Sequence, residues 1–338
     1  MKIAIIGLGK MGLSHASIIG AHHYKEELHV CDTNKLVQSG LKKYSSGTVF
    51  HNDYKKMLAS TNLDAVLVAT PTSLHFPIVS ECIAKNIPVF CEKPFCLSPT
   101  KSAELATKSE ELGIVTQVGY HNNFLGTFTE MKRLLNQNII GDLFHFTGES
   151  NGPVVLRKKK KTWRTSSKEG GGCLSDYAAH VVNLLQVTLG KVQSVKGSIL
   201  KKLWSEDVED AVYSNLFLEN GLSGSISVNW SDETFRKMST SITVQGTLGK
   251  IICDATELKI YLNKSNSHEG LEQGWNIKYL TELTPPVWFN LRGEEYSSQI
   301  DHFLKNAKNS TQNSVNSFRE AAETNETLSK IRNDSETT

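Results

Sequence analysis

Three side chains that can take part in proton transfer stand in two short segments of this sequence. Lys93 follows the apolar run IPVFCE, and Asp176 and His180 lie four positions apart in GGGCLSDYAAH. Side chains with this spacing lie on one face of a helix. A lysine, a carboxylate and an imidazole at one site could remove the proton of an alcohol and stabilise the negative charge that forms on oxygen. The alternatives are a surface pair for Asp176 and His180 and a solvated Lys93.

A glycine-rich segment stands near the start of the chain. GLGKMG (7–12) has GxGxxG spacing and directly follows the apolar run KIAII. Such glycines permit a tight turn, an approach of backbone to a pyrophosphate, and close packing of the next helix. Asp32 ends the second apolar run, where a carboxylate binds ribose hydroxyls and repels a 2′-phosphate. The pattern predicts NAD rather than NADP as cofactor. The alternative is a glycine-rich turn that binds nothing.

The elements that must position these residues alternate regularly from Met1 to about Tyr120. Apolar runs of strand length alternate with amphipathic helical stretches, which predicts a parallel sheet with helices on both faces. The predicted strands are 2–7, 28–32, 48–50, 64–70, 87–92 and 114–119. The predicted helices are 11–22, 34–44, 53–59, 74–85 and 99–112. Ser98 is expected to cap the last helix, with Pro99 in its first turn and Gly113 after its end.

The pattern changes in the rest of the chain. Alternating segments predict strands at 143–150, 241–246 and 250–254, and a hairpin within 210–230 that turns at Asn220 and Gly221. Helices are expected at 127–136, 171–189, 296–307 and 318–331, followed by a frayed polar tail. The alternation suits a sheet with one face covered by helices and the other available to another subunit.

Length and composition set the broad class. A chain of 338 residues suits two domains, predicted here as 1–121 and 122–338, and 39% hydrophobic and 21% charged residues are ordinary for a globular protein. The net charge of +2 gives no global field for nucleic acid or an anionic membrane. No apolar run reaches the length of a membrane span, so a cytoplasmic location is expected. The six cysteines lack metal-ligand spacing, which predicts buried thiols and no metal site.

Two further segments could recognise an anionic or sugar ligand. LRKKKKTWR (156–164) is either a solvated loop or a site where Arg157 or Arg164 binds a phosphate or carboxylate with two hydrogen bonds. In VWFNLRGEEYSSQ (287–299), aromatic rings could stack on a sugar and Arg292 could bind an anion, although helix capping explains GEEY equally well.

Several of these motifs together resemble the glucose-fructose oxidoreductase, inositol dehydrogenase and rhizopine-catabolism family (Gfo/Idh/MocA). They are the GxGxxG start, ATPTSLH (69–75), Glu92-Lys93-Pro94 and GGGCLSDYAAH, and the resemblance covers nearly the whole chain. It implies an α/β Rossmann domain followed by an α+β domain with an open, mainly antiparallel sheet. Through this sheet, family members often form homodimers or homotetramers. The Lys93–Pro94 peptide bond is expected to be cis.

The resemblance also implies site residues. Lys93, Asp176 and His180 would form the catalytic group, and Trp163 and Arg164 match a WR pair that many relatives carry. The expected cofactor-binding residues are Gly7, Gly9, Lys10, Met11, Gly12, Asp32, Thr70, Pro71, His75, Glu92 and Lys93. The expected substrate-binding residues are Lys93, Tyr120, Asn123, Trp163, Arg164, Asp176 and His180. His75 is equally explained as a residue that starts a helix, and GYHNNF (119–124) stands where many relatives have arginine.

These observations favour an NAD-dependent oxidoreductase that transfers hydride between nicotinamide and a secondary hydroxyl or ketone of a sugar, cyclitol or nucleotide sugar. The alternative enzyme class uses NAD to oxidise a sugar transiently, cleaves a glycosidic bond and reduces the product again, with no net NAD turnover. A third interpretation is a non-catalytic NAD-binding scaffold. The first makes NADH stoichiometrically, the second cleaves its substrate without net NADH, and the third does neither.

Overall fold

The computed structural model describes residues 1–42, 47–158, 162–312 and 315–337. The chain divides into two compact units. The first consists of Met1–His121 and Pro286–Ala322, and the second of Asn122–Pro285 and Glu323–Thr338.

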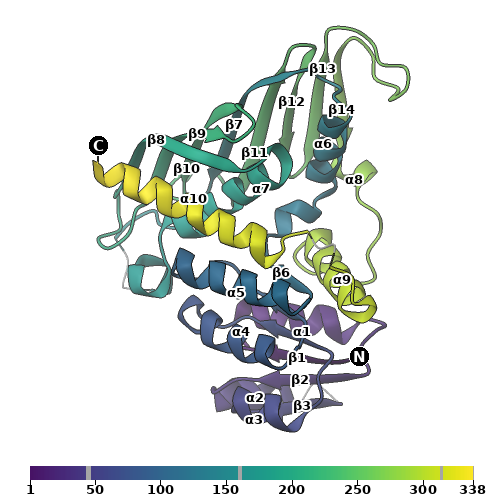
Figure 1. Ribbon diagram of the computed structural model, residues 1–338, viewed down its shortest axis with the longest axis vertical. Coiled ribbons are helices and arrows are strands. Elements are labelled where there is room, and N and C mark those ends of the chain that lie inside the picture. The colour runs from purple at the N-terminus through teal and green to yellow at the C-terminus, as the bar shows by residue number, and fades with distance from the viewer. Residues whose placement is uncertain (43–46, 159–161, 313–314, 338) are drawn as a thin grey trace. The chain divides into compact units, whose positions relative to one another are not determined.

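The first unit contains a parallel sheet of six strands in the order β3-β2-β1-β4-β5-β6 (Figure 1). The strands are β1 (Lys2–Ile6), β2 (Glu27–Cys31), β3 (Thr48–His51), β4 (Ala65–Val68), β5 (Val89–Cys91) and β6 (Thr116–Val118). This order, with its reversal beside β1, confirms the predicted Rossmann fold. All six strands lie where the alternating pattern predicts them.

The helices between these strands are also confirmed. They are α1 (Lys10–Gly20), α2 (Lys35–Lys42), α3 (Tyr54–Ser60), the 3₁₀ turn η1 (Thr72–Leu74), α4 (His75–Ala84) and α5 (Pro99–Glu111). The predicted end of α2 at Tyr44 lies outside the described residues. Ser98 occupies the N-cap position of α5, but within the described structure its side chain makes no capping hydrogen bond. Gly113 follows the helix with φ +66°.

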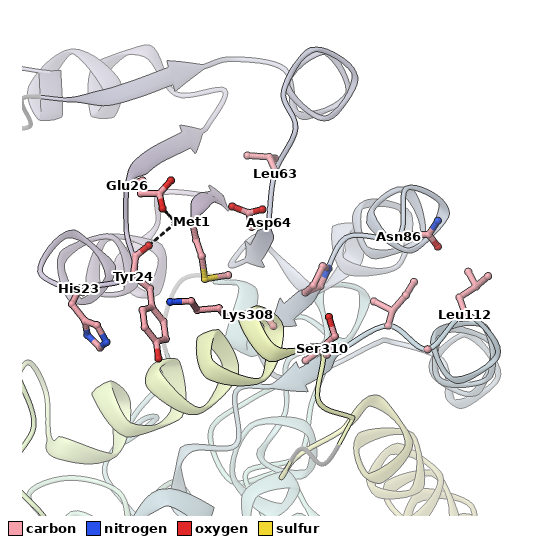
Figure 2. Close-up of a pocket in the computed structure, with 15 residues that line it drawn as sticks. Met1, His23, Tyr24, Glu26, Leu63, Asp64, Asn86, Leu112, Lys308 and Ser310 are labelled. Carbon is pink, nitrogen blue, oxygen red and sulfur yellow. Dashed lines mark hydrogen bonds and ion pairs between the residues drawn. The ribbon is translucent and has the colours of Figure 1, made fainter.

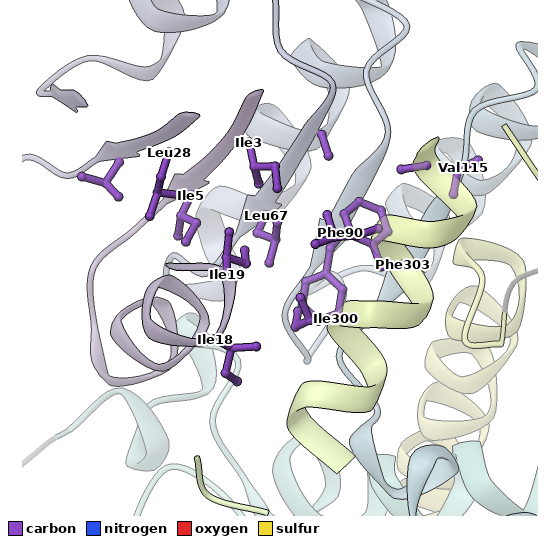
Figure 3. Packing of buried hydrophobic residues seen from close by; sticks show 14 of the residues in the cluster. Ile3, Ile5, Ile18, Ile19, Leu28, Leu67, Phe90, Val115, Ile300 and Phe303 are labelled. Atoms are coloured by element: carbon purple, nitrogen blue, oxygen red, sulfur yellow. The ribbon is translucent and has the colours of Figure 1, made fainter. Parts of the chain in front are cut away.

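One face of this sheet is covered by α1 and by a helix from much later in the chain, α9 (Glu294–Asn309). Figure 3 shows Ile300 and Phe303 of α9 beside Phe90 of β5, with the two phenyl centroids 5.8 Å apart. The sequence analysis placed this helix in the second domain, and the structure differs there. The apolar positions of a helix indicate that one face is buried, but they do not indicate which sheet it covers.

The second unit contains a sheet of eight strands in the order β14-β13-β12-β11-β7-β10-β9-β8 (Figure 1). The strands are β7 (Leu143–Asn151), β8 (Val192–Lys201), β9 (Ala211–Leu218), β10 (Ser223–Asn229), β11 (Ser239–Gly246), β12 (Gly249–Asp254), β13 (Glu257–Leu262) and β14 (Gly274–Tyr279). Only β7 and β10 pair in parallel, so the predicted open, mainly antiparallel sheet is confirmed. The β9–β10 hairpin turns at Asn220 and Gly221, as predicted. The sequence analysis did not locate β8, β13 or β14.

Helices cover one face of this second sheet. Helix α6 (Gly126–Asn136) packs on β12 and β13, and α7 (Ala179–Leu189) packs on β7 and β11. The short elements of the unit are η2 (His121–Phe124), which begins at the last residue of the first unit, η3 (Trp163–Thr165), η4 (Ser167–Glu169), the π-helical turn η5 (Leu174–Ala178) and α8 (Leu280–Leu283). The opposite face carries exposed aromatic side chains, namely Tyr213, Phe217, Tyr261, Trp275 and Tyr279.

The last helix, α10 (Phe318–Thr337), is longer than predicted. The expected frayed tail is wrong for residues 333–337, which continue the helix. The side chain of Asp334 accepts a hydrogen bond from the backbone N–H of Ser198 at 2.7 Å, and this contact holds the polar end against β8. Within the described residues, no helix has both the length and the apolar character needed to cross a lipid bilayer.

Candidate active site

The glycine-rich loop of the first unit leads from β1 into α1. Gly7 has φ +95°, and a Cβ added there would lie 2.7 Å from the backbone oxygen of Ala69. A Cβ on Gly12 would overlap the backbone oxygen of Gly7, whereas a Cβ on Gly9 would meet no described atom within 4 Å. The first and third glycines are therefore required by the packing of the chain itself. The second glycine leaves open space at the start of the helix, where a ligand can approach the backbone.

The carboxylate of Asp32 lies beside this loop. One oxygen accepts a hydrogen bond from the N–H of Leu8 at 2.6 Å, and the other accepts one from the N–H of Asn34 at 2.7 Å. Helix α1 opens with Lys10 and Met11, and its first turn contains no acidic residue. Its N–H groups and positive helix end suit a pyrophosphate. Open space at Gly9 and an anchored Asp32 together fit a dinucleotide.

Lys93 lies two residues after β5, at the carboxyl end of the parallel sheet, and its peptide bond to Pro94 is cis. The neighbouring Glu92 is buried, and its Oε1 lies 2.7 Å from Nε2 of the fully buried His15 on α1. Burial alone would raise the pKa of Glu92, but the hydrogen bond and charge of His15 and the charge of Lys93 outweigh it and lower the pKa. The lowered pKa favours the carboxylate form of Glu92, whose Oε2 accepts a hydrogen bond from the backbone N–H of Lys93 at 3.2 Å. The Glu92 pairing with His15 was not foreseen from the sequence.

Thr70, Pro71 and His75 follow β4 at the same edge of the sheet. His75 is the first residue of α4 and is buried. Its Nε2 lies 2.9 Å from the backbone oxygen of Thr70, and its Nδ1 lies 3.0 Å from that of Pro94. Burial lowers the pKa of this imidazole. His75 thus joins the loop after β4 to the loop that carries Lys93, and a contact with the cofactor stays a prediction.

The chain after β6 brings Tyr120 and His121 to this edge. Tyr120 is buried, and its backbone oxygen accepts a hydrogen bond from Nδ2 of Asn316 at 2.8 Å. The imidazole of His121 stacks on Tyr296 of α9, with ring centroids 4.6 Å apart. Burial and the positive charge of Lys93 lower the pKa of His121 to about 4. Sequence reasoning missed the partnership with Tyr296, because nothing in the local pattern joins positions so far apart.

In the second unit, Asp176 lies in the π-helical turn η5 and His180 in the first turn of α7. Only 3% of Asp176 and 2% of His180 are exposed, which excludes a surface pair. The sequence analysis expected an ordinary α-helix over 171–189, and the π-helical turn at its start is a correction. Such turns are rare and recur at functional sites.

Asp176 is held by the loop that precedes it. Nε of Arg164 donates to Oδ2 of Asp176 at 3.1 Å, and the guanidinium also lies 4.5 Å from the centroid of the Trp163 ring. The hydrogen bond uses one of the five N–H donors of the guanidinium, and 45% of the side chain is exposed. Arg164 is therefore placed to orient Asp176, and exposed Trp163 provides an aromatic surface beside it.

The glycines before Asp176 serve the chain itself. A Cβ on Gly171 would overlap the backbone oxygen of Arg164, and one on Gly172, which has φ +111°, would overlap Oε1 of Glu209. That same carboxylate oxygen accepts a hydrogen bond from the N–H of Leu174 at 2.9 Å. Glycines before a helix can also let backbone approach a ligand. The observed role of Gly171 and Gly172 is to admit the Arg164 loop and Glu209, and Glu209 was not among the predicted site residues.

Asn123 begins a chain of polar side chains that leads into the interior of the second unit. Its Nδ2 donates to Oδ1 of Asn183 at 2.8 Å, and Nδ2 of Asn183 lies 3.2 Å from the hydroxyl oxygen of Thr324. Asn183 lies on α7, three residues after His180. This network supports the helix that carries the imidazole, and Asn183 is a further residue that the sequence analysis did not select.

The basic segment is described only in part, because Lys159, Lys160 and Lys161 lie outside the described residues. Lys158 is exposed and lies 3.6 Å from an exposed Glu206 carboxylate, a contact of little energetic weight. All six cysteines are reduced and buried, as expected. Among the described residues, no three His, Cys, Asp or Glu side chains are grouped so that they could hold a metal ion.

A cavity of about 530 Å³ opens in the first unit at the opposite edge of the sheet (Figure 2). Met1 and Asp64 line it, and both stand at the amino ends of strands. Its ionic groups are satisfied within the protein: the Met1 amine lies 3.0 Å from Glu26, and the Lys308 ammonium lies 4.1 Å from the Tyr24 ring centroid. Dinucleotides bind at the carboxyl ends of such strands, so this cavity is not the cofactor site.

Comparison with known proteins gives matches to two family models. Residues 1–120 match the NAD-binding Rossmann fold of the Gfo/Idh/MocA oxidoreductase family, and residues 128–252 match the C-terminal domain of the same family.

Curated relatives and a solved structure agree with these models. Glucose-6-phosphate 3-dehydrogenase of Bacillus subtilis (strain 168) is 27% identical over 186 residues, which are 54% of this chain and 52% of that protein. The scyllo-inositol 2-dehydrogenase (NAD(+)) of the same strain is 26% identical over 239 residues, 67% of this chain and 66% of that protein. The matches thus span only about half to two thirds of the length of these relatives. Levoglucosan dehydrogenase in complex with NADH and levoglucosan shares the fold, with a TM-score of 0.87 at 18% identity over 100% of this chain and 97% of that one.

Proposed function

The chain belongs to the Gfo/Idh/MocA oxidoreductase family, and from this premise we propose that it is an NAD-dependent dehydrogenase or reductase. Its substrate would carry a secondary hydroxyl, or the corresponding ketone, on a sugar, cyclitol or nucleotide sugar. The observation that carries the proposal is the burial of Asp176 and His180 at the start of α7. A folded protein rarely buries an acid and an imidazole together unless they serve a structural or chemical purpose.

The residues at the carboxyl edge of the first sheet would hold the cofactor. Gly9 and the first turn of α1 would receive the pyrophosphate, and Asp32 would bind the adenosine ribose. When bound, NAD supplies an acceptor for the hydride that leaves the substrate carbon. Lys10, Met11, Thr70 and Pro71 lie in the loops and the helix start at this edge and stay predicted contacts.

The chain's own residues would handle the proton. We assign His180 as the base that takes the proton from the substrate hydroxyl, since imidazole titrates near neutral pH. The Lys93 ammonium would stabilise the negative charge that develops on that oxygen and help to relay the proton. Asp176 would orient His180 or bind a neighbouring hydroxyl, and Arg164 would fix the Asp176 carboxylate through the 3.1 Å hydrogen bond.

Mass spectrometry of the products tests this assignment. The protein would be incubated with NAD and a panel of UDP-sugars, free sugars, uronates and inositols, with Lys93→Ala as control. We expect a product two hydrogen atoms lighter than its substrate, formed with one equivalent of NADH and absent with the variant. A cleaved glycoside with NAD unchanged would instead establish the transient-oxidation chemistry, and no product from any class would contradict both.

The preference for NAD is also proposed from the position of Asp32. Removing its carboxylate removes the group that opposes a 2′-phosphate, so Asp32→Ala should shift the ratio of NADP to NAD affinities about tenfold towards NADP. Fluorescence titration of NADH and NADPH measures both dissociation constants. An unchanged ratio would remove Asp32 from this role.

The exposed aromatic face of the second sheet supports a homodimer or homotetramer. Trp275 and Tyr279 are each more than half exposed on β14, and Tyr261 lies directly opposite Trp275 on β13. An aromatic patch of this kind is typical of a surface that another subunit covers. Analytical ultracentrifugation should give a mass of at least two chains, and Trp275→Lys should lower it. A monomer at micromolar concentration would contradict the proposal.

A further inference from the structure

Arg292 occupies a strained position at the entrance to α9. Its φ of +71° lies in the left-handed region, which costs a non-glycine residue on the order of 1 kcal/mol, and Gly293 follows with φ +135°. Strained residues of this kind gather at binding sites. The side chain is exposed, and within the described part of the chain no carboxylate forms an ion pair with it. The arginine is therefore held in place by backbone conformation and not by a salt bridge.

An aromatic surface supports its guanidinium. The Arg292 guanidinium lies 5.3 Å from the centroid of the Tyr296 ring, which in turn stacks on His121 with an interplanar angle of 22°. The stacking and a hydrogen bond to the Tyr296 hydroxyl together restrict the guanidinium. The stack thus presents an ordered cation at the edge of the first sheet, where ligands of such sheets bind.

Two basic side chains and two carboxylates surround this stack. Lys93 and Arg292 both act electrostatically on His121, so two basic side chains lie near one imidazole. The nearby Glu92 is buried and bonded to His15, which directs one of its oxygens away from a ligand. Glu295 also acts electrostatically on Tyr296 and is the second carboxylate of the group. His121, with its pKa of about 4, is neutral near pH 7.

We propose that Arg292 binds an anionic group of the substrate, a phosphate or a carboxylate, while Lys93 acts on the hydroxyl that reacts. A planar guanidinium donates two parallel hydrogen bonds to either anion, which a lysine cannot do. This inference rests on the proposed function, because it names the substrate class of the same site. Two other arginines were considered for an anion: Nε of Arg164 already donates to Asp176, and Arg157 is an exposed residue of the basic segment.

The test compares charged and neutral sugars on the NADH-loaded protein. Glucose 6-phosphate, D-glucuronate and D-glucose are titrated at low ionic strength, with NADH fluorescence and calorimetry as readouts. We expect the wild type to bind at least one anionic sugar about tenfold more tightly than D-glucose. Arg292→Gly should abolish this preference, and its folding is not at risk because glycine accepts a positive φ. Arg292→Lys should retain part of it.

Arg319→Gln is the matched control, because Arg319 is a partly exposed arginine of the same unit that pairs with Glu110. It should keep the full preference for anionic sugars. Equal affinities of the wild type for all three sugars would overturn the proposal, as would a preference that survives in Arg292→Gly. A loss of NADH affinity in Arg292→Gly by the same factor would assign the arginine to the cofactor's pyrophosphate instead, which also overturns it.

The anion-binding test and the test of the dehydrogenase reaction can fail independently of each other. An Arg292-dependent preference for anionic sugars, without oxidation of any of them, would support the anion site and contradict the dehydrogenase. Oxidation of neutral sugars that is unaffected by Arg292→Gly would support the dehydrogenase and contradict the anion site.

Discussion

The two units position their chemical groups by different means. In the first unit, Asp32, Lys93 and His121 each follow a strand of one parallel sheet, namely β2, β5 and β6. Strand direction alone brings such residues to the same edge. In the second unit, Asp176 is positioned by a loop that folds back onto a π-helical turn, through Arg164 and Glu209.

This difference suggests how each region should respond to substitution. Lys93 and His121 can be replaced with little effect on the backbone, because hydrogen bonds between strands hold it, whereas Asp32 also binds the N–H groups of Leu8 and Asn34. The region around Asp176 depends on individual side-chain contacts and on glycines that leave no room for a Cβ. We therefore expect changes in the first unit to alter chemistry and changes around Gly172 to alter folding as well.

The largest effect should come from the two residues assigned to proton transfer. Lys93→Ala and His180→Ala should each lower kcat by roughly 10² to 10⁴, the usual range for general acid–base groups. His180→Ala should bind NADH as the wild type does, Lys93→Ala should keep most of that affinity, and both variants should melt within a few degrees of the wild type. Steady-state kinetics, fluorescence titration and thermal denaturation measure the three quantities.

Lys101→Ala provides a control for removing a lysine from the same unit, since Lys101 lies over the Phe76 ring, 5.0 Å from its centroid, at the start of α5. It should leave kcat unchanged. Wild-type turnover in either Lys93→Ala or His180→Ala would contradict the catalytic assignment of that residue.

The next effect concerns folding of the second unit. Gly172→Ala adds a Cβ that overlaps the Glu209 carboxylate at φ +111°, so the cost includes both backbone strain and displacement of Glu209. We expect a loss of about 2 to 4 kcal/mol in the free energy of unfolding. Gly221→Ala is the matched control, because Gly221 also has a positive φ of +84° but a Cβ there meets nothing within 4 Å. It should lose only about 1 kcal/mol. Equal losses in urea denaturation would show that the Glu209 contact is unimportant.

Much of the first unit could be predicted because its elements are local. Each strand and helix between β1 and β6 is encoded by a continuous periodic segment, and the GxGxxG loop fixes where the sheet begins. Local periodicity could not predict which sheet α9 covers. Its apolar positions, including Ile300 and Phe303, are equally compatible with either sheet, and only the fold shows that they cover Phe90.

The candidate site was predicted only in part for a similar reason. Lys93, Asp176 and His180 stand in recognisable motifs, whereas the groups that hold them do not. Glu209 lies just before an ordinary strand and His15 is a single histidine on a helix, so neither stands in a motif that indicates a role at the site. Hydrogen bonds between residues far apart in the sequence determine these roles, and such contacts leave no periodic pattern in the sequence.

The smallest expected effect is a pH dependence in the first unit. The folded protein holds the pKa of His121 at about 4, below its ordinary value of 6.5, chiefly because of burial and the Lys93 charge. Between these values the unfolded chain binds a proton that the folded chain excludes. The stability that depends on neutral His121 is thus present above pH 6.5 and is lost as the pH falls towards 4.

His121→Phe keeps a ring against Tyr296 but cannot titrate. Between pH 7 and pH 5 the wild type should therefore lose about 2 kcal/mol more than the variant in urea denaturation. His75, whose pKa burial also lowers, is present in both proteins, so the difference isolates His121. Identical pH profiles would mean that His121 is as accessible to protons in the folded chain as in the unfolded one. A variant that fails to fold would contradict the inference that His121 can be replaced with little effect on the backbone.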